Sequence, residues 1–207
     1  MCFCEHQDVV ILAITLPQFI NPRLEFILWS TPSTGDVPTN GKCVRDVCRN
    51  AVWSLSSCKP GHGITQLLDD STDTFWQSDG PQPHCVNIQF PQKTTLTRLC
   101  LYTDYKADES YTPSRMAIRV GNTIHDLVEL VEIELQEPTG WSVLPLAWID
   151  GSPIRIFLLQ IVILANHQNG RDTHLRAIRL HSPVQQRGLD VLCPLDGLEY
   201  SSFMTPR

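Results

Sequence analysis

The chain has 207 residues, a formal net charge of −6, 42% hydrophobic residues and only 18% charged residues. The hydrophobic share suffices for a packed core, which excludes wholesale disorder. The acidic balance argues against a nucleic-acid surface and favours basic partners. At this length we expect an N-terminal extension over residues 1–44, one domain over residues 45–183 and a C-terminal tail over residues 184–207.

The eight cysteines show no tight framework spacing. Cys85 and Cys100 fall in strand-like runs, where a thiol behaves as a small hydrophobe. Cys2-Phe3-Cys4 lacks a second pair at zinc-site spacing, so we interpret it as a free end. The sequence contains no Asn-X-Ser/Thr sequon, and together these features predict reduced thiols and an intracellular protein.

The N-terminal extension contains one apolar run, Val9 to Leu16. This run is too short to cross a bilayer. Glu5 and Asp8 precede it, where a signal peptide would carry basic residues. We therefore expect a poorly ordered or atypical extension without a function of its own, and no association with membranes.

From residue 50 onward, short strand signals alternate with turn signals. Residues 51–57, 85–90, 96–102 and 116–120 each resemble a strand, and residues 64–68 a short helix. Residues 127–135 alternate apolar and acidic side chains, and their Val and Ile content favours a strand over a helix. About eight short strands between residues 50 and 182 predict an all-β sandwich or jelly roll.

Three polar loops are the candidate binding surface: residues 74–84, 104–114 and 164–174. The third follows the apolar run 154–163 and is richer in amides, imidazoles and charges than a turn requires. If the loops meet at one end of the sandwich, they form a polar, aromatic-lined rim whose carboxylates would suit a basic peptide. We interpret Trp53 and Trp141 as core residues. The possible rim residues are Trp76, Asp104, Tyr105, Asp108, Glu109, Tyr111, Asn166 and His167.

Signatures of catalysis are missing from the sequence. It has no phosphate loop, dinucleotide fingerprint, nucleophile elbow or zinc-helix motif. His167, Asp172 and His174 could be imagined as a hydrolytic set, but no motif supplies a nucleophile or an oxyanion hole. We therefore expect a binding protein without cofactor or metal. The weak calcium candidates are Asp69, Asp70 and Asp73, whose carboxylates would suit a hard cation or would cap their own turn.

Several motifs carry a resemblance to known families. Ser54, Ser56 and Ser57, followed by Thr74-Phe75-Trp76-Gln77-Ser78, resemble the galactose-binding-like sandwiches, which implies a fold and no function. A closer similarity lies in residues 51–61, 76–80, 108–114 and 164–174. These motifs resemble the Doc domain family, in particular the subunit 10 family of the anaphase-promoting complex, from about Arg45 to Pro183.

The Doc resemblance implies a non-catalytic substrate-recognition subunit of a cullin-RING-type ubiquitin ligase. Such a subunit acts with a propeller-type coactivator as co-receptor for destruction-box degrons, promotes processive ubiquitination of mitotic regulators, and contacts tetratricopeptide and cullin-type scaffold subunits. The expected localisation is nucleus and cytoplasm. The positions that match the family's degron-facing residues are Ser110, Asn169 and His174.

Two further expectations follow from the resemblance. Arg171 and Asp172 are expected to brace the third loop rather than contact the ligand. The family's tail ends in Ile-Arg and docks into a tetratricopeptide subunit, whereas this chain ends in Pro206-Arg207, so only Arg207 matches that docking element. The alternative function for this fold is a carbohydrate-binding module, because related sandwiches bind sugars at the same rim.

Overall fold

The computed structural model describes residues 13–15, 44–148 and 150–184, with residues 13–15 described by their backbone alone. Most of the predicted extension, the predicted tail, the Cys2-Phe3-Cys4 motif and Arg207 lie outside the described residues.

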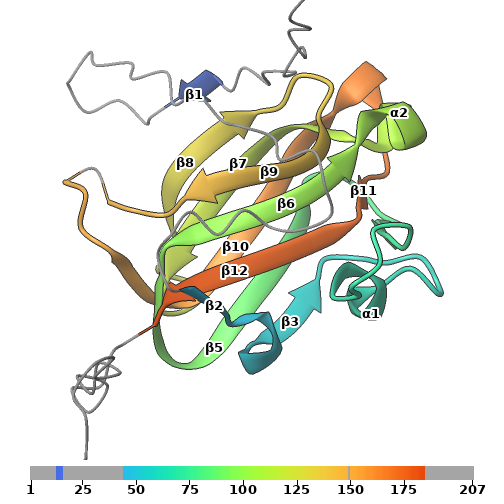
Figure 1. Cartoon of the computed structure of the whole chain (residues 1–207). Helices are drawn as coiled ribbons and strands as arrows, with labels where there is room; N and C mark the ends of the chain where they lie inside the picture. The colour runs from blue at the N-terminus through green and yellow to red at the C-terminus, as the bar shows by residue number, and fades with distance from the viewer. Residues whose placement is uncertain (1–12, 16–43, 149, 185–207) are drawn as a thin grey trace, which may run out of the picture.

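Two antiparallel sheets face each other and form a β-sandwich (Figure 1). The larger sheet has six strands in the spatial order β1 (Ala13–Thr15), β8 (Val128–Glu134), β7 (Pro113–Gly121), β10 (Ile154–Asn166), β5 (His84–Leu96) and β3 (Val52–Leu55). The smaller sheet has four strands in the order β2 (Val44–Asp46), β12 (Ala177–Pro183), β6 (Arg98–Asp104) and β9 (Thr139–Pro145). A separate ladder joins β4 (Trp76–Gln77) and β11 (His174–Leu175).

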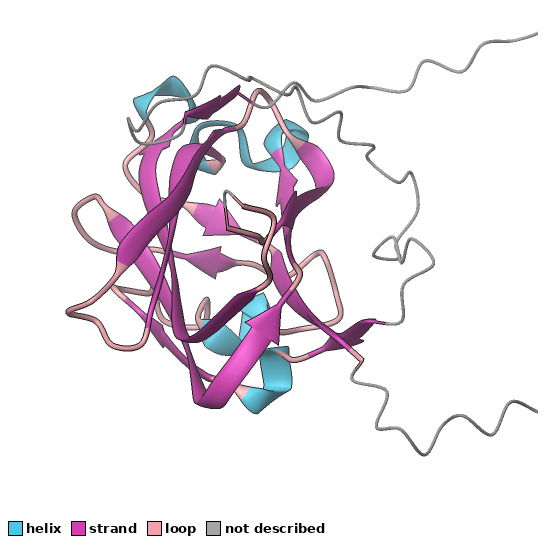
Figure 2. Ribbon diagram, turned by 90° about the vertical axis from the view of Figure 1, so that its left-hand side faces the viewer, coloured by secondary structure: helices cyan, strands magenta, loops and turns pink. Residues whose placement is uncertain are grey.

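Helical structure is confined to short segments at the margins of the strands (Figure 2). The four-residue helices are α1 (Ile64–Leu67) and α2 (Tyr105–Asp108). The 3-10 turns are η1 (Cys48–Asn50), η2 (Glu109–Tyr111) and η3 (His167–Asn169). No helix in the described part of the chain is long and apolar enough to cross a membrane.

The predicted all-β sandwich is confirmed. In the described part of the chain, ten strands, β3 to β12, begin between residues 50 and 182, where about eight were expected. The additional ones include β4 and β11, which have two residues each and are too short to show a period of two in sequence. The segment 127–135 contains strand β8, Val128–Glu134, as its Val and Ile content indicated.

The core fills the space between the two sheets. In β5, Val86, Ile88 and Phe90 are buried while the alternate residues face outward, as a half-buried strand requires. Trp53 and Trp141 are both buried, as predicted. Trp141 belongs to a smaller cluster with Cys100 and Ala177 rather than to the main core. Among the described cysteines, Cys48, Cys58, Cys85 and Cys100 are free thiols.

The strand directions define two ends of the sandwich. At one end β5 and β7 begin and β10 finishes, so residues 74–84, 104–114 and 164–174 all emerge there. This end is called the rim end, and it carries α2 and β11 at the right of Figure 1. At the far end β5 and β12 finish and β10 begins.

Candidate functional site: a rim of three loops

The three polar loops meet at the rim end, so the condition for a shared rim is met. Gln82 Nε2 donates a hydrogen bond to the carbonyl oxygen of Gly170 over 2.9 Å. The His167 amide donates to the Thr112 carbonyl, also over 2.9 Å. The third loop thus contacts both others, and we call the combined surface of residues 74–84, 104–114 and 164–174 the rim.

The second loop has more regular structure than expected. The side chain of Asp104 caps α2 by accepting hydrogen bonds from the amides of Lys106 and Ala107 at 3.1 and 3.3 Å. The chain then enters η2 at Glu109, whose φ is +42°. Asp104 Oδ1 is therefore engaged by its own backbone, while the residue stays partly exposed.

Gly170, which follows Asn169, brings the third loop against Ser110. Gln168 and Asn169 adopt left-handed backbone conformations with φ of +52° and +56°, a region that Asn tolerates better than most residues. Gly170 follows with an ordinary φ of −58°, but a Cβ atom at this position would collide with the backbone carbonyl of Ser110. The absence of a side chain on Gly170 therefore lets the two loops touch. Asn169 is exposed and Ser110 is partly buried.

Asn166 braces this loop from beneath. Its Nδ2 donates to the carbonyls of Gly170 and Asp172 at 3.1 and 2.8 Å, and its Oδ1 accepts from Thr173 Oγ1 at 3.0 Å. The side chain is buried, so its assignment as a rim contact was wrong: all these polar atoms serve the loop itself. Arg171 and Asp172 contribute to the loop's bracing through their backbone carbonyls. The Arg171 carbonyl contacts His84 Nε2, and the Asp172 carbonyl accepts from Asn166.

His174 lies in the middle of a stack of four rings. Its ring centroid is 4.2 Å from Phe75 on one side and 4.2 Å from Tyr111 on the other, and His62 stacks on the outer face of Phe75 at 4.6 Å. Only 11% of the His174 side chain is exposed. Its Nε2 is buried and has no hydrogen-bond partner among the described residues.

Asp108 anchors the other edge of the His174 ring. Its Oδ1 is 3.1 Å from His174 Nδ1, and Arg176 donates to both carboxylate oxygens at 2.8 and 2.9 Å. Burial alone would raise the pKa of Asp108, but hydrogen bonds from His174 and Arg176 and the Arg176 charge outweigh it and hold that pKa below its usual range. The prediction of Asp108 as an exposed acidic rim group was wrong, because the carboxylate is buried and paired.

Trp76 was also wrongly assigned to the rim surface. Its side chain is fully buried, and its Nε1 donates to the Ser57 carbonyl at 3.0 Å. Strand β4 turns Trp76 into the core, and the neighbouring Phe75 contributes to the ring stack instead. Of the residues predicted for the rim surface, Glu109 and Tyr111 are exposed, the latter by 39%.

His167 belongs to the third loop, is partly exposed, and its ring contacts the second loop. Its ring meets Tyr105 edge-on at 4.9 Å, and Gln168 Nε2 donates to the Tyr105 hydroxyl at 3.2 Å. Burial lowers the pKa of His167 below the usual histidine value. This contact pins α2 against η3.

Sequence reasoning missed three members of the site: His62, Phe75 and Arg176. A signal was available for Arg176, because residues two apart in an extended segment point to the same side. Arg176 and His174 therefore both reach Asp108. No comparable signal places His62, which comes from a turn beside α1, next to Phe75.

In the Asp69-Asp70-Ser71-Thr72-Asp73 turn, the carboxylates of Asp69 and Asp70 already have partners within the protein. Asp69 accepts hydrogen bonds from the Asp70 amide at 2.8 Å and from Thr74 Oγ1 at 3.3 Å. Asp70 pairs with Arg179 at 3.1 Å. Across residues 44–148 and 150–184, no group of three His, Cys, Asp or Glu side chains is placed to hold a metal ion.

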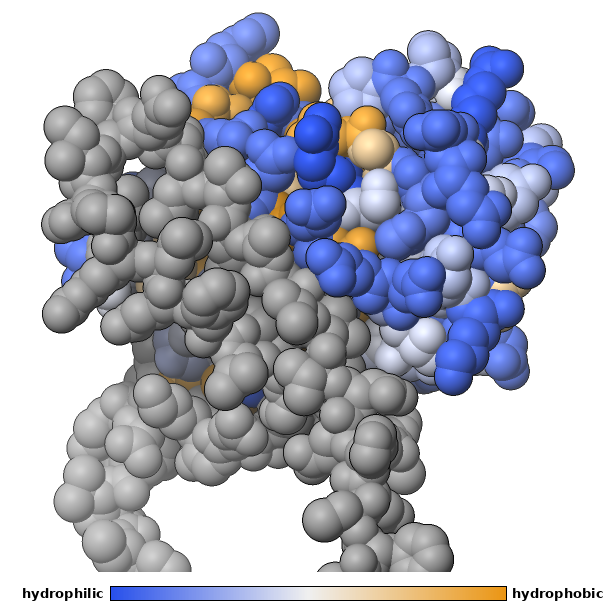
Figure 3. All heavy atoms as spheres, turned by 90° about the horizontal axis from the view of Figure 1, so that it is seen from above, coloured by the Kyte–Doolittle hydropathy of each residue, from blue (hydrophilic) through white to orange (hydrophobic). Residues whose placement is uncertain are grey.

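The described part of the face seen from above is predominantly hydrophilic, with small apolar patches (Figure 3). An exposed surface of this kind suits polar ligands better than a large apolar interface.

Comparison with solved structures identifies the fold. A family 32 carbohydrate-binding module from NanJ of C. perfringens, solved with galactose, has a TM-score of 0.56 at 12% identity, covering 68% of this chain and all of that module. A chitosan-binding module from Paenibacillus sp. IK-5 has a TM-score of 0.53 at 15% identity, covering 66% of this chain and 98% of the module. The fold is thus the predicted galactose-binding-like jelly roll.

Comparison of sequences identifies the family. The family model described as "Anaphase-promoting complex, subunit 10 (APC10)" matches residues 30–199. Anaphase-promoting complex subunit 10 of Homo sapiens is 57% identical over 70% of this chain and 79% of its own length. The Drosophila melanogaster protein of that name is 51% identical over 79% of this chain and 85% of its own length. The chain belongs to the anaphase-promoting complex subunit 10 family.

Proposed function

We propose that this chain is a substrate-recognition subunit of the anaphase-promoting complex that binds destruction-box degrons at its rim, together with a propeller-type coactivator. Family membership supports its association with that ubiquitin ligase. The observation that carries the degron assignment is the close approach of Gly170 to Ser110, because it brings together the two loops that carry Ser110 and the exposed Asn169.

The chemistry of these residues suits an extended peptide. A serine hydroxyl and an asparagine amide each donate and accept, so they can bond both peptide groups and polar side chains. His174 is a third contact in this proposal: its Nε2 has no partner among the described residues but is buried, so the rim must open before a ligand can bond it. These few contacts would bind weakly alone, and joint capture with a coactivator would supply the affinity.

In this proposal the rim binds the degron of the substrate, and other subunits of the ligase transfer ubiquitin. In this proposal, a tetratricopeptide subunit and a cullin-type scaffold hold the chain in the ligase, and the complex works in nucleus and cytoplasm. The docking of Arg207 into a tetratricopeptide subunit remains part of the proposal. Substrates are mitotic regulators whose ubiquitination becomes more processive when the rim retains them.

The carbohydrate-binding alternative relies on the fold alone. It requires an aromatic platform for a sugar ring, yet Trp76 is buried and one face of Tyr111 is covered by His174. A glycan array probed with the purified chain would support this alternative if a sugar bound and an Asn169→Gly variant did not bind it.

The degron assignment is tested with the double variant Ser110→Ala/Asn169→Gly in a reconstituted ligase. Glycine at position 169 removes the amide and retains the left-handed backbone at no steric cost. We expect degron-dependent ubiquitination to lose processivity by about tenfold, equivalent to the loss of one good polar contact, while the variant still co-purifies with the complex.

The matched control is Ser142→Ala/Glu137→Gly, which removes a serine hydroxyl and a polar side chain at a left-handed position outside the three loops. Glu137 also has a positive φ of +43°, so glycine is equally compatible there. Wild-type processivity in the Ser110→Ala/Asn169→Gly complex would refute the site assignment. Failure of the wild-type chain to enter the complex would refute the function as a whole.

A further inference from the structure

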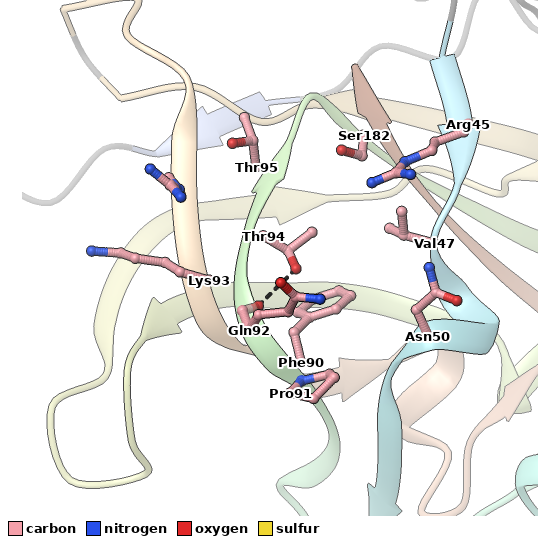
Figure 4. Close-up of a pocket in the computed structure, with 11 residues that line it drawn as sticks. Arg45, Val47, Asn50, Phe90, Pro91, Gln92, Lys93, Thr94, Thr95 and Ser182 are labelled. Carbon is pink, nitrogen blue, oxygen red and sulfur yellow. Dashed lines mark hydrogen bonds between the residues drawn. The ribbon is translucent and has the colours of Figure 1, made fainter. Parts of the chain in front are cut away.

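An open groove lies at the far end of the sandwich, away from the rim. It has a volume of about 510 Å³ and is bounded by the second half of β5, the start of β10, the end of β12 and the β2–η1 segment. Arg45 and Lys93 extend on opposite sides of it (Figure 4). No residue of the rim lines this groove.

The groove is cationic. Arg45, Lys93 and Arg155 line it, all three are exposed, and no carboxylate is among the lining residues. Five other arginines pair with carboxylates elsewhere in the described chain, whereas these three side chains have no ion-pair partner among the described residues. In a chain of net charge −6, three unpaired cations at one groove form a local positive field that attracts anions.

The backbone along the groove also has free pairing capacity. The register of β5 with β10 passes from Gln89 to Thr94, and the register with β3 ends at Gln89. Residues 90–93 of β5 therefore lie at a register shift and have no partner in either register, although the Gln92 carbonyl accepts a hydrogen bond from Thr94 Oγ1 at 2.8 Å. An extended peptide can add to such an unpaired strand segment through main-chain hydrogen bonds.

The remaining lining groups fit a peptide better than an isolated anion. Phe90 and Val47 supply a buried apolar floor, and hydroxyl and amide side chains lie between the cations: Asn50, Gln92, Thr94, Thr95 and Ser182. The three cations come from three different strands, and Arg45 lies across the groove from Lys93 (Figure 4).

We propose that this far-end groove binds an acidic peptide segment of a partner protein. The glutamate or aspartate side chains would pair with Arg45, Lys93 and Arg155, and the peptide backbone would lie along residues 90–93. This site is independent of the degron-binding role, so the rim and the far end could be occupied at the same time.

The test uses the full chain and a fluorescein-labelled deca-glutamate peptide, with binding measured by fluorescence anisotropy at physiological salt. We expect the wild type to bind it, and the variant Arg45→Glu/Lys93→Glu/Arg155→Glu to lose at least about tenfold in affinity, since three partly exposed ion pairs are replaced by repulsion. A second variant with glutamine at the three positions tests the same point if charge reversal prevents folding.

The matched control is Lys59→Glu/Lys106→Glu/Arg171→Glu. These three exposed cations also lack an ion-pair partner among the described residues, and their reversal changes the net charge equally. Retained binding by this control supports the groove. Equal losses in both variants, no binding by the wild type, or binding of a phosphoserine decapeptide without binding of deca-glutamate would each overturn the proposal.

Discussion

Asp108 Oδ1 lies 3.1 Å from His174 Nδ1, and this contact fixes the orientation of the His174 ring within the rim. Asp108 is itself held by two hydrogen bonds from Arg176. Because Phe75 and Tyr111 sandwich the ring, its remaining freedom is small. The rim therefore presents a histidine whose position is set before a ligand arrives, which reduces the entropy lost on binding.

The first prediction concerns the Asp108 carboxylate. Asp108→Asn removes the charge that pairs with Arg176 while keeping the size of the side chain. A buried cation without its partner is costly, so we expect the free energy of unfolding to fall by about 3 kcal/mol. Urea unfolding monitored by circular dichroism measures this loss.

Asp79→Asn is the control for that substitution. Asp79 is an exposed rim aspartate, and the same change of charge at a surface position should shift the free energy of unfolding by less than about 0.5 kcal/mol. Equal urea midpoints for Asp108→Asn and the wild type would show that the Arg176 pair does not stabilise the fold.

The strands of the sandwich were predictable because alternation and β-branched content are local signals. Residues 85–90 lie in β5, and β8 occupies Val128–Glu134 within the segment 127–135, as their patterns indicated. The clustering of three polar loops at one end also followed from strand direction. Two loops lead into β5 and β7 and the third leaves β10; because β10 runs antiparallel between β5 and β7, the loops share one edge of the sandwich.

The roles of individual rim residues were less predictable, because they depend on contacts between distant segments. Trp76 and Asp108 have residue types typical of a binding surface, yet each is buried. Asp108 is neutralised by Arg176, which lies 68 residues further along the chain. Asn166 resembles a ligand contact in sequence and is a brace in the structure, since only the folded loop shows which carbonyls lie near its amide.

The second prediction concerns the approach of the second and third loops. In Gly170→Ala the new methyl group meets the Ser110 backbone carbonyl, which cannot move as a flexible side chain could. We expect the loops to separate, with degron binding to the reconstituted ligase reduced by about tenfold, because a displaced contact contributes little. Surface plasmon resonance with a destruction-box peptide on the coactivator-bound complex measures the change.

Gly63→Ala provides the control for Gly170→Ala. A Cβ atom there would be 3.7 Å from Cys58 Sγ, an ordinary contact, so degron binding should be unchanged. If Gly170→Ala binds the peptide as well as Gly63→Ala does, the close approach of Ser110 and Gly170 is not needed for recognition.

The third prediction concerns the pH dependence contributed by His167. Burial lowers its pKa in the folded chain, so below the usual histidine pKa of about 6.5 the unfolded chain takes up a proton that the folded ring resists. Proton uptake by the unfolded chain therefore lowers the free energy of unfolding as pH falls from 7 toward 5. His167→Phe keeps an aromatic ring against Tyr105 and removes the titration, so its free energy of unfolding should fall less over that range.

Urea unfolding at pH 7.5, 6 and 5 measures how the free energy of unfolding changes with pH in the wild type and in the variant. The two proteins should differ most at pH 5. His181, whose pKa burial also lowers, is unchanged in both proteins and contributes equally to both slopes. Parallel slopes for the two proteins would mean that His167 takes up its proton as readily in the folded chain as in the unfolded one.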